Sequence, residues 1–303
     1  MFYPERRTVV VHLKGGLGNQ LFMYAAGRRL AFMNGMDLAI DLRTGFARDH
    51  VYSRSYALGD FPLAARTATK VERLGRALHV ARRLVRTTGS LQKLAGSWLL
   101  LDDAEDFNPQ ILQLKPHRTV HLDGYWQSPR YFSGVESLLQ EELRLASSTW
   151  ARSASLASEI RGSNSVAVHI RSFGSTAGNQ TKDVSRDYYL EALKAVHSFE
   201  EKPTLWVFAP SAQVAREILG DPVLRAARLI LPSRDRSDAH DLWLMSRARH
   251  LVMANSTFSW WAGWLGRSGE GRVYMPWHPG GPGSRAWNDS AMQLDGWTRI
   301  GTR

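Results

Sequence analysis

The chain has no cysteine and no long hydrophobic run, and its acidic residues are outnumbered by its basic ones. The absence of cysteine excludes disulfides, thiolate metal ligands and cysteine nucleophiles. No apolar segment reaches the roughly 18 residues that a membrane span requires, and the first residues show no signal-peptide pattern. We therefore expect a cytoplasmic protein.

The charge imbalance points to an anionic partner. Lys and Arg number 39 against 28 Asp and Glu, a formal net charge of +11, and such a chain attracts nucleic acid, phospholipid headgroups or phosphorylated small molecules. Residues 66–93 are strongly basic, opposed only by Glu72, and their apolar residues have helical spacing. Two interpretations stay open: a helix lying on the inner face of an anionic membrane, or a helix packed on the core with a solvated basic face.

Two classes of partner have no support in the motifs. The chain has no zinc-ligand pattern, no RNP-like aromatics and no helix-turn-helix pattern, so a basic nucleic-acid-binding protein is only the less favoured alternative. The acidic run at 102–106 suggests a metal site at first sight. It lies outside the repeating pattern of strands and helices, with Pro109 close behind, so we expect a solvated turn and no metal.

The C-terminal half alternates short apolar strands with amphipathic helices, which is typical of a parallel sheet covered on both faces. The expected strands are 166–170, 204–208, 228–231, 250–253 and 272–275, and the expected helices are 186–196, 213–219, 238–247 and 258–265. The N-terminal half begins similarly, with strands at 8–13, 37–42 and 120–122 and helices at 21–34 and 133–144. We predict an α/β protein of two facing Rossmann-like domains, 1–150, with a basic helical region at 62–100, and 151–303.

Three segments carry candidate chemistry, the first being the glycine turn after the first strand. Gly15, Gly16 and Gly18 precede a helix, where exposed amides favour an anion and glycine lets a ligand approach the backbone. Leu21 replaces the third glycine of the dinucleotide fingerprint, and no Walker pattern follows. The alternative is a plain tight turn, beside which the amide of Asn19 could contact a sugar.

The other two segments follow strands of the C-terminal half, where parallel sheets bind their ligands. His169 and Arg171 alternate with apolar residues and should share one face, where an arginine can neutralise a phosphate with its bidentate fork. Asn255, Ser256 and Thr257 follow the strand at 250–253 and open a helix. Their hydroxyls and free amides would cradle an anion, although alone they are an ordinary helix cap.

Together these segments resemble one family. The motifs of this chain that carry the resemblance are Gly-Gly-Leu-Gly-Asn-Gln-Leu-Phe at 15–22, Gly-Tyr-Trp-Gln-Ser at 124–128, His169-x-Arg171, Asp241-x-x-Leu-Met, and Asn-Ser-Thr-Phe-Ser-Trp-Trp at 255–261. In this order and spacing they resemble the α-1,2-fucosyltransferases of glycosyltransferase family 11. The resemblance implies a GT-B-like fold and an inverting, metal-independent transfer of L-fucose from GDP-fucose to a hydroxyl, expected to be O2 of a galactoside on a glycan or lipid-linked acceptor, without a cofactor.

The resemblance also implies roles for single residues. Arg171 would grip the β-phosphate, Asn19 would reach the phosphate or the fucose, and His169 and Asp241 would lie near the nucleoside. The implied donor-binding set is Gly16, Gly18, Asn19, Gln20, His169, Arg171, Asp241, Asn255, Ser256, Thr257, Phe258 and Ser259. The N-terminal domain would take the acceptor through Tyr125, Trp126 and Gln127, whose aromatic rings are equally consistent with a core position.

The chain departs from the family in two places. The family often has Arg-Gly-Asp-Tyr after the position of Arg171, where this chain has Ser-Phe-Gly-Ser at 172–175, so the second arginine and the acid are missing; and 208–211 reads Phe-Ala-Pro-Ser. A transferase of the same fold that uses another GDP-sugar is therefore the alternative. The expected catalytic residues are Arg171, Asn19 and Asp183. Asp183 is the nearest downstream carboxylate that could act as base, and a dissociative transfer without a strong base is the other option.

Overall fold

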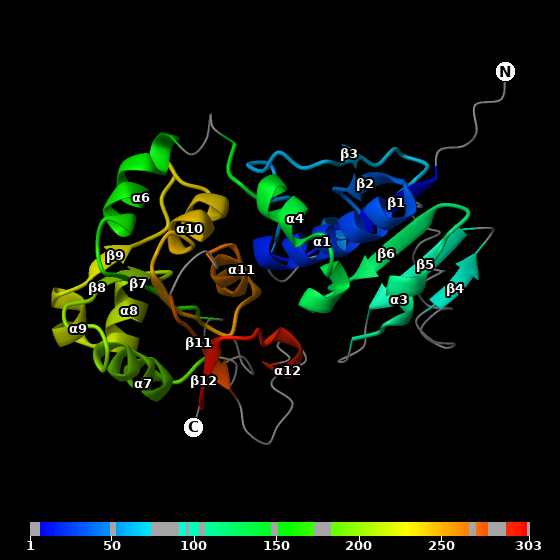
Figure 1. The fold of residues 1–303 in the computed structure, drawn as a ribbon. Coiled ribbons are helices and arrows are strands. Elements are labelled where there is room, and N and C mark those ends of the chain that lie inside the picture. The colour runs from blue at the N-terminus through cyan, green and yellow to red at the C-terminus, as the bar shows by residue number, and fades with distance from the viewer. Residues whose placement is uncertain are drawn as a thin grey trace. The chain divides into compact units, whose positions relative to one another are not determined.

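A computed structural model describes residues 7–48, 53–73, 91–94, 97–102, 107–146, 151–172, 183–266, 271–277 and 289–301. The chain divides into two compact units, Met1–Arg144 and Leu145–Arg303. Each unit is built on a six-stranded sheet (Figure 1). The boundary expected at residue 150 lies a few residues later in the chain than this division.

The N-terminal unit has its first strand near the middle of the sheet, in the order β3-β2-β1-β6-β5-β4. All neighbouring pairs are parallel except β4 and β5, which are antiparallel. The strands are β1 (Thr8–His12), β2 (Asp37–Asp41), β3 (Arg66–Thr67), β4 (Leu91–Leu94), β5 (Ser97–Asp102) and β6 (Val120–Gly124). The helices are α1 (Leu17–Asn34), η1 (Phe46–Arg48), α3 (Gln110–Gln113), η2 (Pro129–Phe132) and α4 (Glu136–Glu142).

Helix α1 covers one face of this sheet. A Cβ added at Gly27 would collide with Val11, crowd Leu38 and touch Leu122, so those three side chains point toward the helix. Successive side chains of a strand point to opposite faces. The residues that alternate with them, including His12 of β1 and Asp41 of β2, therefore lie on the face away from α1.

The C-terminal unit is a fully parallel sheet in the order β12-β11-β10-β7-β8-β9. Its strands are β7 (Ser165–His169), β8 (Thr204–Phe208), β9 (Arg228–Ile230), β10 (His250–Val252), β11 (Val273–Trp277) and β12 (Trp297–Gly301). Its helices are η3 (Ala151–Ser153), α6 (Ala154–Arg161), α7 (Arg186–His197), α8 (Ala212–Leu219), α9 (Asp221–Arg225), α10 (Asp238–Met245), α11 (Thr257–Leu265) and α12 (Asp289–Met292). Helix α11 carries Trp260, Trp261 and Trp264, all buried, which makes it a core helix.

The predicted α/β fold with two Rossmann-like units is confirmed, and three local predictions are wrong. Helix α1 begins at Leu17 rather than at 21, because Gly16 is its N-cap, so Gly18, Asn19 and Gln20 lie in its first turn. The region 62–100 is not helical throughout: it contains β3, β4 and the start of β5, and residues 74–90 lie outside the described chain. Strand β12 was not predicted, because its polar sequence becomes a strand only by pairing with β11.

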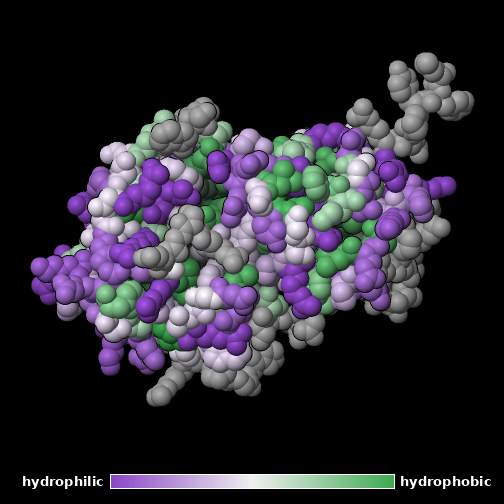
Figure 2. Space-filling view, in the orientation of Figure 1, coloured by the Kyte–Doolittle hydropathy of each residue, from purple (hydrophilic) through white to green (hydrophobic). Residues whose placement is uncertain are grey.

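The surface in Figure 2 is largely hydrophilic, broken by small hydrophobic areas. The large hydrophobic side chains that are exposed among the described residues include Phe32, Val71 and Tyr125. No helix in the described ranges is long and apolar enough to cross a membrane.

Candidate functional site

The carboxyl edge of the C-terminal sheet brings two of the predicted segments together. β7 ends at His169 and leads into Arg171, while its neighbour β10 leads through 253–256 into helix α11. Nη1 of Arg171 donates a hydrogen bond to Oγ of Ser256 at 3.0 Å. The sequence predicted that both segments bind an anion, and the structure places them side by side.

The hydroxyl of Ser256 has two partners among the described residues. It is the N-cap of α11, where its Oγ accepts from the backbone N–H of Phe258 at 3.3 Å, and the same oxygen accepts from Arg171. Its side chain is 1% exposed. The hydroxyl therefore fixes the guanidinium to the start of the helix, and α11 presents backbone N–H groups at the same end.

Ser259, predicted in the donor-binding set, points into the protein. It is fully buried, and its hydroxyl donates to the carbonyl oxygens of Ala254 at 3.4 Å and Ser256 at 3.3 Å. Its place one turn into α11 faces the core because the helix is buried on most sides. This side chain stabilises the turn instead of facing a ligand.

His169 is a neutral side chain beside a cation. Burial, and then the charge of Arg171, lower the pKa of His169 to about 3. Its ring is tilted against that of Phe258 with the centroids 5.3 Å apart, and Nδ1 has no hydrogen-bond partner within the described ranges. His169 thus offers a neutral imidazole next to Arg171 and does not add positive charge.

Two tyrosines of α7 that the sequence did not assign to the site hold the strand ends in place. The hydroxyl of Tyr188 lies 2.7 Å from the carbonyl oxygen of Met253 and 3.0 Å from that of Tyr274. The hydroxyl of Tyr189 donates to the carbonyl oxygen of His169 at 3.1 Å. The ends of β7 and β10, and the first part of β11, are tied to one helix, which keeps the Arg171 segment and the α11 cap in register. The adjacent Tyr-Tyr pair at the start of a predicted helix was the available signal.

Asp183 and Asp241 both lie between the Arg171 segment and the α11 cap in the sequence. Oγ of Ser172 donates to Oδ2 of Asp183 at 3.2 Å, so the predicted base lies beside the Arg171 segment. Asp241 is in the first turn of α10, which packs against α11. Burial raises the pKa of Asp241, and an ion pair with Nε of Arg236 at 2.8 Å opposes that shift. Arg236 was not predicted.

In the N-terminal unit the glycine turn has a left-handed backbone conformation that favours glycine. Gly15 has a φ of +72°, and an added side chain there would lie 2.8 Å from Nδ2 of Asn19 and 3.3 Å from Cε1 of Tyr125. A Cβ added at Gly16 would have no neighbour within 4 Å among the described residues, so the backbone at Gly16 is open to a ligand. Oδ1 of Asn19 accepts from Nε2 of Gln127 at 2.9 Å. The glycine turn and the predicted acceptor segment therefore form one cluster.

Gln20 is a structural residue of this turn. Its side chain is fully buried; Nε2 donates to the carbonyl oxygens of Gly15 at 2.8 Å and Ser55 at 2.9 Å, and Oε1 accepts from the N–H of Ala57 at 2.9 Å. The prediction that Gln20 contacts the donor does not fit this geometry, because both ends of the amide already hold the backbone.

Trp126 likewise belongs to the core, whereas its neighbour does not. Trp126 is 3% exposed, adopts a φ of +53°, and packs edge-on against Tyr131 with the ring centroids 5.2 Å apart. Tyr125 is 41% exposed, and Nζ of Lys14 lies 5.0 Å from the centroid of its ring. The unusual backbone at Trp126 turns one aromatic ring inward and leaves the other at the surface.

A chain of buried polar side chains lies on the sheet face away from α1. Oδ2 of Asp41 lies 2.8 Å from Nδ1 of His12, whose Nε2 is 3.2 Å from Nδ1 of His121. Despite burial, hydrogen bonds from His12 and Thr44 lower the pKa of Asp41 to about 2, and burial lowers the pKa of His121 to about 3. The polar residues inside apolar strands were the signal for this cluster, which was not predicted.

At the same edge, Nζ of Lys14 donates to Oδ1 of Asp123 at 3.1 Å. Asp123 lies two residues after His121 in β6, and Lys14 two residues after His12, so both share the polar face. The side chain of Asp123 is 3% exposed and that of Lys14 is 16% exposed. The carboxylate is thus largely buried, whereas the ammonium reaches the surface next to Tyr125.

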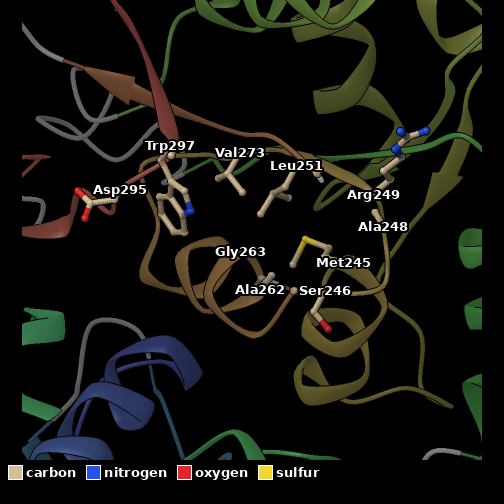
Figure 3. Close-up of a pocket in the computed structure, with 13 residues that line it drawn as sticks. Met245, Ser246, Ala248, Arg249, Leu251, Ala262, Gly263, Val273, Asp295 and Trp297 are labelled. Carbon is tan, nitrogen blue, oxygen red and sulfur yellow. The ribbon is translucent and has the colours of Figure 1, made fainter. Parts of the chain in front are cut away.

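A cavity of about 260 Å³ lies at the opposite, amino edge of the C-terminal sheet (Figure 3). Leu251, Val273 and Trp297, each at the start of a strand, point toward α11, and Met245 and Ser246 close it from the end of α10. Parallel sheets bind ligands at their carboxyl ends. We therefore place the candidate site at Arg171 and Ser256 instead of in this cavity. The described residues contain no group of three or more His, Asp or Glu side chains that could hold a metal ion.

A comparison with family models matches residues 102–300 to the family described as glycosyl transferase family 11. The chain belongs to this family. It is a glycosyltransferase, and the resemblance found in the motifs is confirmed.

Individual relatives agree with this assignment. An α-1,2-colitosyltransferase of Escherichia coli is 26% identical over 264 residues, which cover 85% of this chain and 87% of that protein. The structure of the Bradyrhizobium α-1,6-fucosyltransferase NodZ soaked with GDP-fucose matches with a TM-score of 0.56 and 16% identity, over 86% of this chain and 93% of that one. A structure of Arabidopsis thaliana FUT1 in complex with GDP matches with a TM-score of 0.55 and 14% identity, over 88% and 70%. The expected GT-B-like fold is confirmed.

Proposed function

We propose that this glycosyltransferase moves L-fucose from GDP-fucose to O2 of a galactoside on a glycan or lipid-linked acceptor, with inversion at the sugar and without a metal ion. The observation that carries the proposal is the hydrogen bond between Arg171 and Ser256 at the N-terminus of α11. It puts a fixed cation and a helix N-terminus at the edge of the sheet where nucleotides bind.

This arrangement suits a diphosphate leaving group. A guanidinium is always charged and matches phosphate oxygens with two parallel donors. Because Ser256 already orients the Arg171 side chain, little reorganisation is needed when negative charge develops on the departing GDP. Backbone N–H groups at the start of α11 add to the same field. Arg171 and the helix would therefore do electrostatically what a divalent cation does in a metal-dependent transferase.

The bonds change in one displacement. The acceptor oxygen attacks the anomeric carbon as the bond from that carbon to the β-phosphate oxygen breaks, and GDP leaves with the electron pair. Attack opposite the leaving group inverts the configuration. In this scheme Asp241 and the neutral His169 contact the nucleoside end of the donor. Asn19, which accepts a hydrogen bond from Gln127, is proposed to contact the phosphate or the fucose.

The second candidate function is the transfer of a different sugar from its GDP-sugar by the same fold. The relative in Escherichia coli is an α-1,2-colitosyltransferase, and the chain has Ser172 where its family often has a second arginine. Colitose lacks one hydroxyl of fucose, and a site that hydrogen-bonds a sugar hydroxyl strongly rejects an analogue without it. Initial rates with GDP-fucose, GDP-colitose and GDP-mannose at equal concentration separate the two.

The experiment for the function itself is transfer to simple galactosides in the presence of EDTA, with the linkage of the product assigned by NMR. GDP-fucose turnover and an α-1,2-linked product support the proposal. Turnover of GDP-colitose alone would support the second candidate. A product that forms only after Mn²⁺ or Mg²⁺ is added would contradict the metal-independent mechanism.

Contact with an anionic membrane is a separate part of the proposal. It rests on the basic excess of residues 66–93, of which Arg66 is already paired with Glu72. Co-sedimentation with vesicles containing phosphatidylglycerol, against vesicles of phosphatidylcholine alone, tests it at physiological salt. Equal recovery with both kinds of vesicle would contradict it.

A further inference from the structure

The mechanism above needs a group that takes the proton of the acceptor hydroxyl, and the N-terminal unit offers a buried carboxylate for that step. We propose that Asp123 is this base, held by Lys14 beside an acceptor sugar that stacks on Tyr125. The inference rests on the proposed function and adds to it the base and the shape of the acceptor subsite.

The position of Asp123 is set by the fold. It lies near the carboxyl end of β6, the strand next to β1, and the chain continues from it through Gly124 into the predicted acceptor segment. Lys14 follows β1 directly and donates to Oδ1 of Asp123 at 3.1 Å. The carboxylate therefore stands where the first strand, its glycine turn and the acceptor segment meet.

The groups around Asp123 have the chemistry of a sugar subsite. Tyr125 is the exposed aromatic ring of the segment, and such a ring covers the apolar face of a pyranose. Lys14 lies over that ring at 5.0 Å, and Gly15 leaves room for the ring and for Asn19 because it has no side chain. The bonded amides of Asn19 and Gln127 close the cluster with polar groups that suit hydroxyls.

Lys14 holds the carboxylate of Asp123 in an ion pair. A neighbouring ammonium favours the ionised form of a carboxylate, which is the form that can accept a proton. As the acceptor oxygen bonds to the anomeric carbon, its proton passes to the carboxylate and GDP departs with the electron pair of the broken bond. The protonated carboxyl then releases the proton to water. No co-reactant beyond the donor and the acceptor is needed.

Asp183 is the competing base, and its surroundings argue against it. It is bonded to Ser172, the residue next to Arg171, which is proposed to hold the leaving phosphate. An inverting displacement puts the attacking hydroxyl opposite the leaving group. A base beside the phosphate-binding residue would therefore be on the leaving side of the sugar, whereas Asp123 directly precedes the segment assigned to the acceptor.

Steady-state transfer kinetics of the Asp123→Asn variant test the proposal. The control is Asp37→Asn, the same substitution in the same sheet, at the amino end of β2 instead of the carboxyl end of β6. We expect Asp123→Asn to lower kcat by about a hundredfold or more, the usual contribution of a positioned base. The KM for the galactoside should change less than about threefold. Affinity for GDP, measured by calorimetry, should stay within about twofold, and Asp37→Asn should transfer at nearly the wild-type rate. Transfer within fivefold of wild type in Asp123→Asn, or a loss confined to KM, overturns the proposal.

The Lys14→Met variant provides a second readout that does not depend on removing the carboxylate. Without the ammonium the carboxylate is protonated more easily, so the acid limb of the pH profile of kcat/KM should move to higher pH. An unchanged acid limb overturns the assignment. If wild-type enzyme neither binds GDP nor turns over any GDP-sugar, the proposed function itself fails; wild-type turnover with an unaffected Asp123→Asn variant rejects this inference alone.

Discussion

Nη1 of Arg171 donates to Oγ of Ser256 across 3.0 Å, although the two residues are 85 positions apart in the sequence. The bond joins the end of β7 to the first residue before α11, and both segments are anchored by tyrosines of α7. A hydroxyl that caps a helix is thereby also the support of the residue proposed to hold the donor phosphate.

Substitution of Arg171 tests the proposed phosphate contact. Arg171→Ala should lower kcat/KM for GDP-fucose by about a hundredfold or more. The variant loses the hydrogen-bond donor that is proposed to face the negative charge developing on the departing GDP. Arg171→Lys should recover only part of this loss, since an ammonium keeps the charge but not the paired donors. Steady-state kinetics on both variants, with melting temperature as the folding control, provide the check. Activity in Arg171→Ala close to that of wild type would remove Arg171 from the mechanism.

Ser256→Ala separates helix capping from ligand binding. Loss of the cap should cost about 1 kcal/mol of stability, and loss of the support for Arg171 should weaken GDP binding about tenfold. Ser211→Ala is the matched control, because Ser211 caps α8 by accepting from Val214 at 3.2 Å. It should lose similar stability and bind GDP like wild type. Equal GDP affinity in the two variants would contradict the role of Ser256.

The neighbours Tyr125 and Trp126 should respond in opposite ways to truncation. Trp126→Ala removes a buried ring that packs on Tyr131 and should cost about 3–5 kcal/mol of stability. Tyr125→Ala removes an exposed ring, so stability should change by less than about 1 kcal/mol while the KM for the galactoside rises. Chemical denaturation and acceptor titrations measure the two effects. A stable Trp126→Ala protein with a raised acceptor KM would show that Trp126 faces the sugar.

His121 should make the N-terminal unit less stable as the pH falls. Burial holds its pKa near 3 in the folded protein, against an ordinary value of 6.5, so below pH 6.5 only the unfolded chain takes up this proton. Stability is then highest above pH 6.5 and declines by up to about 1.4 kcal/mol per pH unit as the pH falls toward 3. The His121→Asn variant keeps an N–H group that can donate a hydrogen bond to His12, but it has no imidazole to titrate. The denaturant midpoint of the variant should therefore fall less steeply than that of wild type between pH 7 and 5. Parallel slopes for wild type and variant would contradict the assignment.

Most strands and helices of the C-terminal unit could be predicted because each is a local pattern. The parallel strand ends that carry His169 and Arg171, and the cap at Ser256, follow from alternation and cap chemistry within a few residues. The contact between Arg171 and Ser256 depends on β7 lying next to β10, which no local pattern specifies. The motifs therefore identified the two segments, but their contact could be seen only once the order of the strands was known.

Other features that the sequence did not specify have equally specific causes. Gln20 lies in a family-like motif, yet its amide is held by the backbone of Ser55 and Ala57, which are 35 and 37 positions away. Trp126, for which a core position stayed open, packs on Tyr131. The strands at 91–94 and 97–102 were interpreted as part of a basic helix because helical spacing upstream suggested continuation. The ion pair of Lys14 and Asp123 joins residues 109 positions apart and becomes visible only when β1 and β6 are paired.

The central claim is that Arg171 and the start of α11 bind the diphosphate of a GDP-sugar without a metal ion. Isothermal titration of GDP into the protein in EDTA, for wild type and Arg171→Ala, tests it most directly. The account predicts saturable binding by wild type and a loss of about tenfold or more in the variant. No binding by wild type at millimolar GDP, or equal affinity in the two proteins, would contradict it.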